Sequence, residues 1–371
     1  MAAAPCSWHI PCARGCNHCG NLPVPSAATP EIVVGIVANP ASGRDIRRLT
    51  AKASVFPTAE KANMIQRLLG PLGQLGVTRV LMMPDATGIS AGVIRAVRTH
   101  HAQRLPPWPR LEFVDIPLQD GAEDSVTAAR AMAAAGARLI VVLGGDGTHR
   151  VVAGAVPGMP LATLSTGTNN VFPDLREATV TGLAAGLFAT GRVPPERALR
   201  RNKCLHVQVG DRHELALVDV CVTRMAHVGA RAVWSGETIT ELFVAFAEPD
   251  AIGLSSIAAM VEPIGRDEPD GAYVRCAGDG RTVWATIAPG LVSCLGVAEA
   301  GRMQPGVDYL VATRRGSIAL DGEREIELLD GEGAVVRLAL DGPWTLDVGA
   351  TLREAVSRGA LGGDAVRPPD P

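Results

Sequence analysis

The chain has 371 residues, of which 47% are apolar, and this is long enough for two packed domains of roughly 100–200 residues each. The net charge is −3, from 35 Lys and Arg against 38 Asp and Glu, without a long block of either sign, which argues against a nucleic-acid partner. The apolar runs fall far short of the roughly 20 residues that a membrane helix needs, which argues against a membrane protein.

The first 30 residues differ in composition from the rest of the chain. They carry Cys6, Cys12, Cys16 and Cys19, enough thiols for a zinc or iron–sulfur site, between Ala- and Pro-rich flanks that are typical of disorder or of a start codon placed too early. The role of these four cysteines is left open. The other four cysteines are scattered, as in a reducing compartment, and the chain does not start like a secretory signal. We expect a disordered extension over residues 1–30 of a cytoplasmic protein.

From Glu31 onward, apolar runs alternate with stretches of helical spacing, the pattern of βαβ units with a parallel sheet. We therefore expect an α/β domain over residues 31–198. Gly136 is a plausible stop for a helix that begins at Asp124 or Ser125. The predicted strands are 32–38, 77–83, 111–116, 138–143 and 161–164, and the predicted helices are 88–100, 124–135, 150–155 and 176–190.

The region from residue 199 to 345 is dominated by short alternating stretches between glycine turns, which predicts a β-rich second domain. One helix is expected within it, over residues 236–247, because Ile239, Leu242, Phe243 and Phe246 share one helical face. A helix and a loose tail are expected over residues 346–371. The predicted strands are 205–209, 215–222, 282–287, 309–313, 318–320 and 335–340.

The run Gly144-Gly145-Asp146-Gly147-Thr148 joins the clearest predicted strand to a helix. Ligands of open α/β sheets bind at such strand ends, and glycines let phosphate oxygens approach backbone amides at a helix N-terminus. Asp146 beside a phosphate would repel it unless the carboxylate holds Mg²⁺, receives a hydroxyl or acts as a base. A tight turn with a capped helix explains the same residues without any ligand.

Three loops together carry a family resemblance. The run from Gly144 to Thr148 resembles the GGDGT signature shared by NAD kinases, diacylglycerol and sphingosine kinases and, more distantly, phosphofructokinases. The segments Asn39-Pro40-x-Ser42-Gly43 and Thr166-Gly167-Thr168-Asn169-Asn170 are similar to the other nucleotide-contacting loops of that superfamily. In this order, and with the basic stretch that follows Gly43, they look most like the branch of the ATP-NAD kinase family that includes acetoin catabolism protein X.

The resemblance implies an N-terminal α/β nucleotide-binding domain, a β-rich C-terminal acceptor domain, and a cleft where ATP or polyphosphate donates a phosphoryl group to NAD or a related nucleotide. It also implies Mg²⁺ as cofactor, a possible homo-oligomer, and Asp146 as a group that orients or deprotonates the acceptor hydroxyl. No side chain is assigned as a metal ligand. The predicted nucleotide-binding residues are Asn39, Ser42, Gly43, Arg44, Gly144, Gly145, Gly147, Thr148, Thr166, Gly167, Thr168, Asn169 and Asn170.

Two features leave the acceptor open. NAD kinases and lipid kinases have a carboxylate where this chain has Asn170, whereas Asp321-Gly322-Glu323 matches the triplet that carries the proposed base of diacylglycerol-type kinases. A hairpin turn explains Asp321-Gly322 equally well. The hypotheses are therefore an NAD kinase-like enzyme with Asp146 as the catalytic candidate, a kinase for a lipid or small alcohol with Glu323 as the catalytic candidate, and a nucleotide-binding regulator without catalysis.

Overall fold

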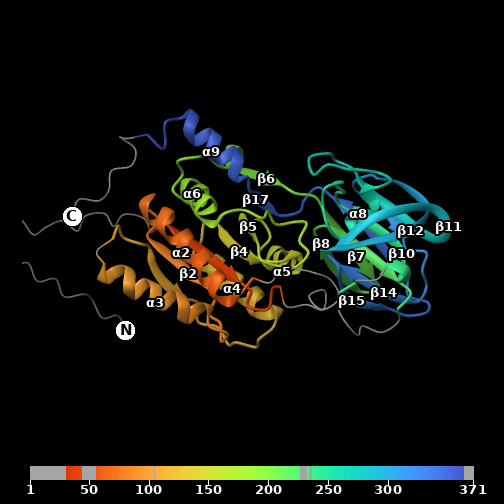
Figure 1. The fold of residues 1–371 in the computed structure, drawn as a ribbon, viewed down its shortest axis with the longest axis horizontal. Coiled ribbons are helices and arrows are strands. Elements are labelled where there is room, and N and C mark those ends of the chain that lie inside the picture. Colours follow the sequence, from red (N-terminus) through yellow and green to blue (C-terminus); the bar gives the residue numbers. More distant parts are fainter. Residues whose placement is uncertain (1–30, 44–55, 104, 226–231, 234–235, 363–371) are drawn as a thin grey trace, which may run out of the picture. The chain divides into compact units, whose positions relative to one another are not determined.

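The computed structural model describes residues 31–43, 56–103, 105–225, 232–233 and 236–362 (Figure 1). The predicted extension over residues 1–30, the candidate Arg44 and the last nine residues of the predicted tail lie outside these described residues. Within the described part of the chain, no helix is both long and apolar enough to cross a membrane.

The first sheet is built mainly from parallel strands in the order β3-β2-β1-β4-β5-β17-β6, and only β6 runs antiparallel to its neighbour β17. The chain passes from β6 into the second region and returns for β17. Its strands are β1 (Val33–Ala38), β2 (Arg79–Met82), β3 (Arg110–Phe113), β4 (Ile140–Gly144), β5 (Leu161–Ser165), β6 (Leu199–Arg201) and β17 (Trp344–Leu346).

Helices cover both faces of this sheet, because successive side chains of a strand point to opposite faces. In β1, Val34 and Ile36 belong to one buried cluster with residues of α2, α3, α6 and α9, whereas Val33 and Val37 belong to another with residues of α4 and α5. The helices are α2 (Thr58–Gln74), α3 (Ile89–Ala102), α4 (Ala122–Ala134), α5 (Asp146–Ala155), α6 (Ala178–Ala189), α7 (Pro195–Ala198) and α9 (Val348–Ser357).

The second region consists of two antiparallel sheets, β12-β11-β10-β9-β14-β15 and β13-β16-β7-β8. Side chains of both sheets share one buried cluster, and α8 covers the other face of the larger sheet. The predicted fold class, an α/β region followed by a β-rich region, is confirmed. The elements are β7 (Cys204–Val209), β8 (Arg212–Ala216), β9 (Asp219–Thr223), η1 (Gly236–Thr238), β10 (Ile239–Val244), α8 (Ser255–Ala259), β11 (Gly271–Ala288), β12 (Leu291–Met303), β13 (Asp308–Leu310), β14 (Gly316–Leu320), β15 (Glu323–Leu328) and β16 (Ala334–Ala339).

The predicted helix over residues 236–247 is wrong. A single 3₁₀ turn is followed by β10, the strand between β9 and β11 in the larger sheet. Phe243 packs into the cluster between the two sheets, whereas Leu242 and Val244 pack on the α8 side. A strand that is buried on both faces loses its polar alternation, so its apolar residues also match a helical spacing.

Two helices also begin earlier than predicted. The helix α4 starts at Ala122 after Gly121, and Asp124 is its third residue, accepting hydrogen bonds from the amides of Gln119 and Gly121. The helix α5 starts at Asp146 rather than at Arg150, so the second half of the glycine-rich run forms its first turn. The sequence did not predict a helix start at Asp146, because glycine is unfavourable inside a helix and Gly147 is the second residue of α5.

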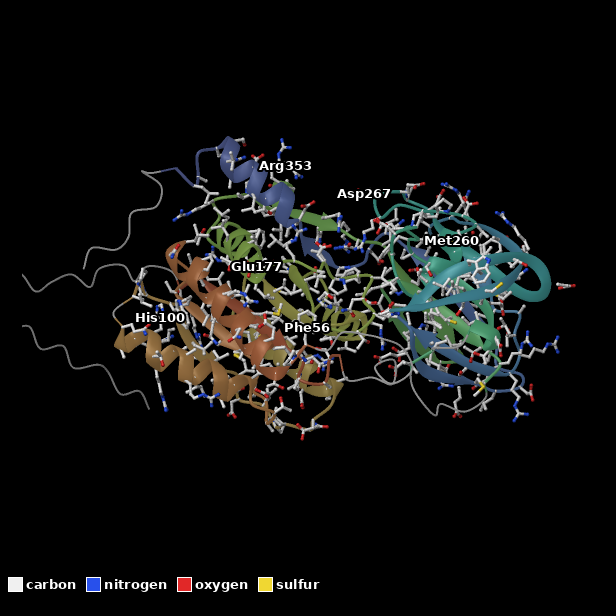
Figure 2. The ribbon with its side chains drawn as sticks, in the orientation of Figure 1. Phe56, His100, Glu177, Met260, Asp267 and Arg353 are labelled. Atoms are coloured by element: carbon white, nitrogen blue, oxygen red, sulfur yellow. The ribbon has the colours of Figure 1, made fainter. Side chains whose placement is uncertain are left out.

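The helices α2 and α6 lie in close contact on one face of the first sheet (Figure 1). Glu177, labelled in Figure 2, accepts hydrogen bonds from the amides of Thr179 and Val180 at the start of α6, and its carboxylate lies 2.8 Å from the guanidinium of Arg67 on α2. Further along, a Cβ added to Gly182 would lie 3.0 Å from the carbonyl oxygen of Leu68. The absence of a side chain at Gly182 is what allows the two helices to approach.

We expect Gly182→Ala to lower the free energy of unfolding by about 1–2 kcal/mol, because overpacking against the α2 backbone outweighs the gain in helix propensity. The matched control is Gly154→Ala in the last turn of α5, where an added Cβ meets nothing within 4 Å. We expect the control to raise stability by roughly 0.5–1 kcal/mol. Urea unfolding of both variants measures this, and equal effects would contradict the packing argument.

Candidate active site

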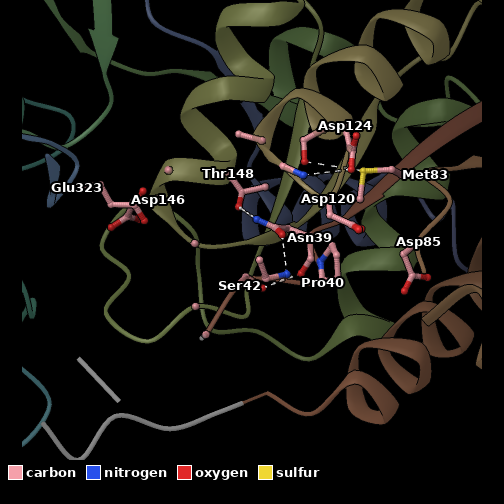
Figure 3. A pocket seen from close by; sticks show the side chains of 18 of the residues that line it. Asn39, Pro40, Ser42, Met83, Asp85, Asp120, Asp124, Asp146, Thr148 and Glu323 are labelled. Carbon is pink, nitrogen blue, oxygen red and sulfur yellow. Dashed lines mark hydrogen bonds between the residues drawn. The ribbon is translucent and has the colours of Figure 1, made fainter. Parts of the chain in front are cut away.

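A cavity of about 320 Å³ opens at the carboxyl ends of β1, β2 and β4 and beside the loop that follows β5 (Figure 3). Successive strands are added on one side of β1 as far as β3 and on its other side from β4 onward. Open α/β sheets bind ligands at the point where the strand order reverses in this way, here between β1 and β4. The turn between β14 and β15 also reaches this cavity. The predicted residues that line it are Asn39, Ser42, Gly43, Gly145, Asp146, Gly147, Thr148, Gly167, Thr168, Asn169, Asn170 and Glu323.

Two predicted residues lie behind the cavity wall rather than on it. Gly144 is the buried last residue of β4, and its carbonyl accepts a hydrogen bond from the amide of Thr166. The Thr166 side chain is also buried, with its Oγ1 lying 2.9 Å from Oγ of Ser42. Gly144 and Thr166 therefore connect the glycine-rich run to the loop that follows β5, and Ser42 connects the loop that follows β1 to the same residues.

Three loops form most of the lining: the first follows β1, the second is the glycine-rich run after β4, and the third follows β5. Asn39 ties the first loop to the second. Its Nδ2 donates to Oγ1 of Thr148 at 2.8 Å, and its Oδ1 accepts from the amide of Ala41 (Figure 3). Beneath this loop lies Lys61 of α2, whose Nζ donates to the carbonyl oxygens of Asn39 and Ser42 at 2.9 Å each. A buried ammonium is stable only with such partners. Lys61 was missed because α2 was not predicted, although a lysine at helical spacing with apolar residues is the signal for it.

The Asp146 carboxylate is the central tie between the second and third loops. Oδ1 accepts from the amides of Val171 at 3.1 Å and Phe172 at 2.9 Å, and Oδ2 also lies 3.1 Å from the amide of Val171. The side chain is 6% exposed. Backbone donors thus engage both carboxylate oxygens, which suits an anchor of the loop.

The two asparagines of the third loop also bind protein atoms. Asn169 donates through Nδ2 to the carbonyl oxygen of Ile287 on β11, and Asn170 donates through Nδ2 to Oγ of Ser165 at 2.6 Å. Oδ1 of Asn170 would lie only 2.3 Å from a Cβ on Gly167 and 2.9 Å from one on Gly145. The two glycines are therefore required here for close packing of two loops.

Glu323 approaches the first turn of α5 from the second region. Asp321 and Gly322 have φ values of 50° and 77° and form the two-residue turn that pairs Leu320 with Glu323, so the hairpin interpretation of Asp321-Gly322 is confirmed. The turn also brings the Glu323 carboxyl oxygens to 3.6 and 3.7 Å from the position of a Cβ on Gly147. A hairpin and a carboxylate at the cavity are thus two consequences of one turn.

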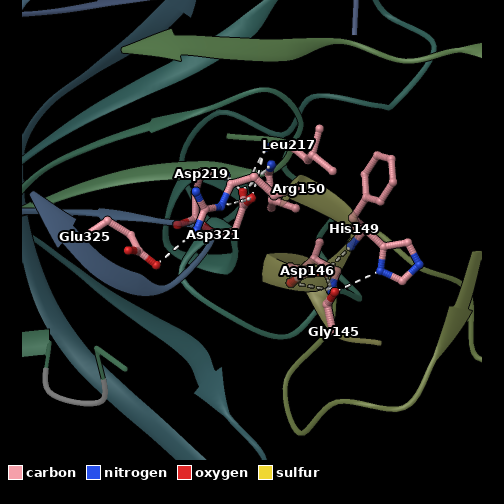
Figure 4. Close-up of polar contacts among 11 residues, drawn as sticks. Gly145, Asp146, His149, Arg150, Leu217, Asp219, Asp321 and Glu325 are labelled. Carbon is pink, nitrogen blue, oxygen red and sulfur yellow. Dashed lines mark hydrogen bonds and ion pairs between the residues drawn. The ribbon is translucent and has the colours of Figure 1, made fainter. Parts of the chain in front are cut away.

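The hairpin is held against α5 by buried charges (Figure 4). Asp321 accepts hydrogen bonds from the amides of Leu217 and Val218 at 2.9 and 2.8 Å, and its Oδ2 lies 3.6 Å from Nε of Arg150. Nη2 of Arg150 also donates to Oε1 of Glu325 at 3.0 Å. Burial raises the pKa of Asp321, while the Arg150 guanidinium and the amides act in the opposite direction. Arg150 therefore joins α5 to the turn that carries Glu323.

The cavity is acidic. Among the described residues that line it, none is basic. Burial alone would raise the pKa of Asp85, but hydrogen bonds from Thr87, Ser90 and Ile89 outweigh it and lower this pKa to about 2. Asp85 follows the carboxyl end of β2 and was not among the predicted site residues. The lining carboxylates are Asp85, Asp120, Asp124, Asp146, Asp321 and Glu323.

His149 follows the glycine-rich run, but its side chain is fully buried and does not line the cavity. Figure 4 shows its contact with Gly145. Its Nδ1 lies 2.8 Å from the carbonyl oxygen of Gly145, and because a carbonyl only accepts, this nitrogen carries the proton. The ring packs near Phe172, with the ring centroids 6.0 Å apart. Burial lowers the pKa of His149 to about 4, so the ring is neutral at pH 7.

Family models match both regions of the chain. Residues 34–193 match the family model of the ATP-NAD kinase N-terminal domain, and residues 203–341 match that of the acetoin catabolism protein X C-terminal domain. The fold and the three loops thus define a protein of the NAD kinase-like class. The crystal structure of yeast NADH kinase complexed with NADH is similar at 13% identity and a TM-score of 0.45, covering 93% of this chain and 91% of that one.

The chain is also 44% identical over 334 residues to acetoin catabolism protein X of Cupriavidus necator, an alignment that covers 87% of this chain and 92% of that protein. The chain belongs to the acetoin catabolism protein X branch of the ATP-NAD kinase family. The family resemblance drawn from the three loops and their order is confirmed.

The neutral state of His149 makes a pH-dependent contribution to stability. The unfolded chain takes up a proton near the ordinary pKa of 6.5, whereas the folded chain does so only near 4. Stability is therefore lost as the pH falls from 6.5 towards 4, by up to roughly 3 kcal/mol. We expect urea unfolding of His149→Gln, which cannot take up this proton, to show a correspondingly shallower loss over this range. Parallel curves for the two proteins would contradict the assignment.

Proposed function

We propose that the protein is an ATP-dependent phosphotransferase that moves a phosphoryl group to a hydroxyl of NAD or a related nucleotide. The observation that carries phosphoryl transfer is the position of the Glu323 carboxylate beside the first turn of α5, opposite the glycine-rich run, and the match of residues 34–193 to the ATP-NAD kinase N-terminal domain supports a nucleotide acceptor. Phosphate groups bind well at a helix N-terminus, because the first amides of the helix have no carbonyl partner within it. A carboxylate at this place can accept the proton of an attacking hydroxyl.

Asp146 and Glu323 then have different roles. The Asp146 carboxylate accepts two backbone amides, so it orders the loop that faces the nucleotide and is a positioning residue. Glu323 is half-buried and belongs to the cavity lining, so it is our candidate for the general base. Because backbone amides already engage both Asp146 oxygens, the substrate proton goes to Glu323 in this scheme.

Mg²⁺ fits the donors of this cavity. Mg²⁺ is held in proteins by one or two carboxylates together with phosphate oxygens, and the lining is rich in carboxylates but lacks a described basic side chain. We propose that Asp120, an exposed carboxylate of the lining, would hold it together with phosphate oxygens, which leaves Glu323 free to accept a proton. The ion would neutralise the charge between the acidic lining and the phosphates. The use of ATP rather than polyphosphate, a cytoplasmic location and self-association remain proposals.

A second candidate function is a kinase for a small alcohol or lipid. It is favoured by Glu323, which matches the triplet of diacylglycerol-type kinases. The two candidates share the donor site and differ only in the acceptor. A panel of NAD, NADH, diacylglycerol and small alcohols with labelled ATP and Mg²⁺ separates them, because only the true acceptor becomes labelled well above the rate of ATP hydrolysis.

The isosteric pair Glu323→Gln and Asp146→Asn tests the division of roles on whichever acceptor is labelled. We expect Glu323→Gln to lower kcat by about 10²–10⁴, the usual contribution of a general base, with an unchanged Tm. We expect Asp146→Asn to lower the free energy of unfolding by about 1–3 kcal/mol as well as activity, because an amide group faces two backbone donors.

Two results would contradict the scheme. Full turnover by Glu323→Gln would remove this residue from the chemistry, whereas full thermal stability of Asp146→Asn would remove the anchor role of Asp146. A chain that labels no acceptor in the panel, while still binding ATP in equilibrium dialysis, would instead favour a nucleotide-binding regulator.

A further inference from the structure

Three side chains of metal-binding types, Cys204, His206 and Asp341, form a cluster outside the cavity described above, which we call the nucleotide cavity. Cys204 and His206 are two residues apart on β7 and therefore point to the same face of their sheet. Asp341 lies two residues beyond Ala339, which pairs with Cys204 across the β7–β16 ladder. The sheet thus brings a thiol, an imidazole and a carboxylate together from positions 135 and 137 residues apart.

The three ligand atoms form a compact triangle. Sγ of Cys204 lies 3.7 Å from Nε2 of His206 and 3.6 Å from Oδ1 of Asp341, and the latter two atoms are 3.3 Å apart. A tetrahedral zinc ion with ordinary bond lengths requires separations of about 3.5 Å for sulfur to nitrogen, about 3.5 Å for sulfur to oxygen and about 3.3 Å for nitrogen to oxygen. The side chains are thus already spaced for such an ion.

The geometry does not suit a catalytic triad. In a nucleophile–His–Asp arrangement the carboxylate binds one ring nitrogen and the nucleophile binds the other. Here both Sγ of Cys204 and Oδ1 of Asp341 lie near the same nitrogen, Nε2 of His206. Three atoms that converge on one point are what a cation requires.

The cluster borders a second cavity of about 430 Å³, which shares no described lining residue with the nucleotide cavity. The last turn of α5, including Ala153 and Gly154, forms part of its wall. Arg201 also lines it and donates through Nη2 to the backbone carbonyl of Asp341 at 2.6 Å. This positive charge opposes a cation, and the partial negative charge of the helix C-terminus favours one.

We propose that Cys204, His206 and Asp341 bind one Zn²⁺ ion, with the fourth coordination position open to water or a ligand in this second cavity. A set of one sulfur, one nitrogen and one oxygen ligand selects zinc over Mg²⁺ or Ca²⁺, which prefer oxygen alone. Binding replaces the thiol proton of Cys204, which is released to solvent. Three protein ligands with one open position are the arrangement of zinc sites that accept an exogenous ligand.

The test uses the full chain with Cys6, Cys12, Cys16 and Cys19 replaced by serine, so that thiols outside the described residues do not bind the metal. After treatment with a chelator, we expect calorimetric titration with Zn²⁺ to give one equivalent per chain and a raised Tm. Titration with Co²⁺ should give a thiolate-to-metal absorption band in the near ultraviolet, which Cys204→Ser abolishes.

The single variants His206→Ala and Asp341→Ala keep the test independent of folding, because their side chains are 50% and 69% exposed. We expect each to weaken Zn²⁺ binding by about 100-fold or more. The matched control is Cys276→Ser, a cysteine of β11 outside the cluster, which should bind as the parent does. Absence of a stoichiometric site in the parent, or unchanged affinity in both His206→Ala and Asp341→Ala, would overturn the proposal.

Discussion

The rest of the site depends on the hydrogen bonds that two backbone amides donate to the Asp146 carboxylate. The amides of Val171 and Phe172 are buried in a loop without regular structure, and buried amides must find a partner. Asp146 supplies it from the first turn of α5. The carboxylate therefore ties the glycine-rich run to the third loop, and the hydrogen bonds of Asn39 and Ser42 add the first loop to the same unit.

This constraint explains why many polar side chains of the three loops form hydrogen bonds with one another. Backbone groups and carboxylates from elsewhere are left to meet a ligand. The buried ion pair of Arg150 with Asp321 and its half-buried pair with Glu325 bring one such carboxylate, Glu323, from the second region to the start of α5. A buried charge network of this kind is costly to break, so it holds the hairpin in one position.

The sequence was sufficient to predict β1 to β5 and the edge where the cavity opens, because the carboxyl ends of parallel strands meet at one edge whatever the side-chain details. It did not indicate β6 and β17, which join this sheet from segments expected in the β-rich region. It was not sufficient for β10, whose two buried faces remove the alternation that distinguishes a strand. Nor did spacing indicate the partner of each polar group. The resemblance of the loops suggested Asp146 as a reactive group, and only the positions of Val171 and Phe172 indicate its role as an anchor.

Sequence patterns also could not predict the contacts between segments that are distant in the chain. Lys61 binds the carbonyls of a loop about 20 residues earlier, and Asp341 meets Cys204 only because β7 and β16 pair in one register. Glu323 was found through family resemblance, since its Asp-Gly turn alone indicates a hairpin. Chain positions that a sheet brings together carry no local signal.

The most direct test of the account is amide hydrogen exchange at Val171 and Phe172 in the wild-type protein and in Asp146→Asn. The account predicts that both amides are strongly protected in the wild type and that the substitution accelerates their exchange by about 10- to 100-fold, the equivalent of 1.4–2.7 kcal/mol, with little change in β1. Unchanged protection of these two amides in the variant would contradict the anchor role of Asp146.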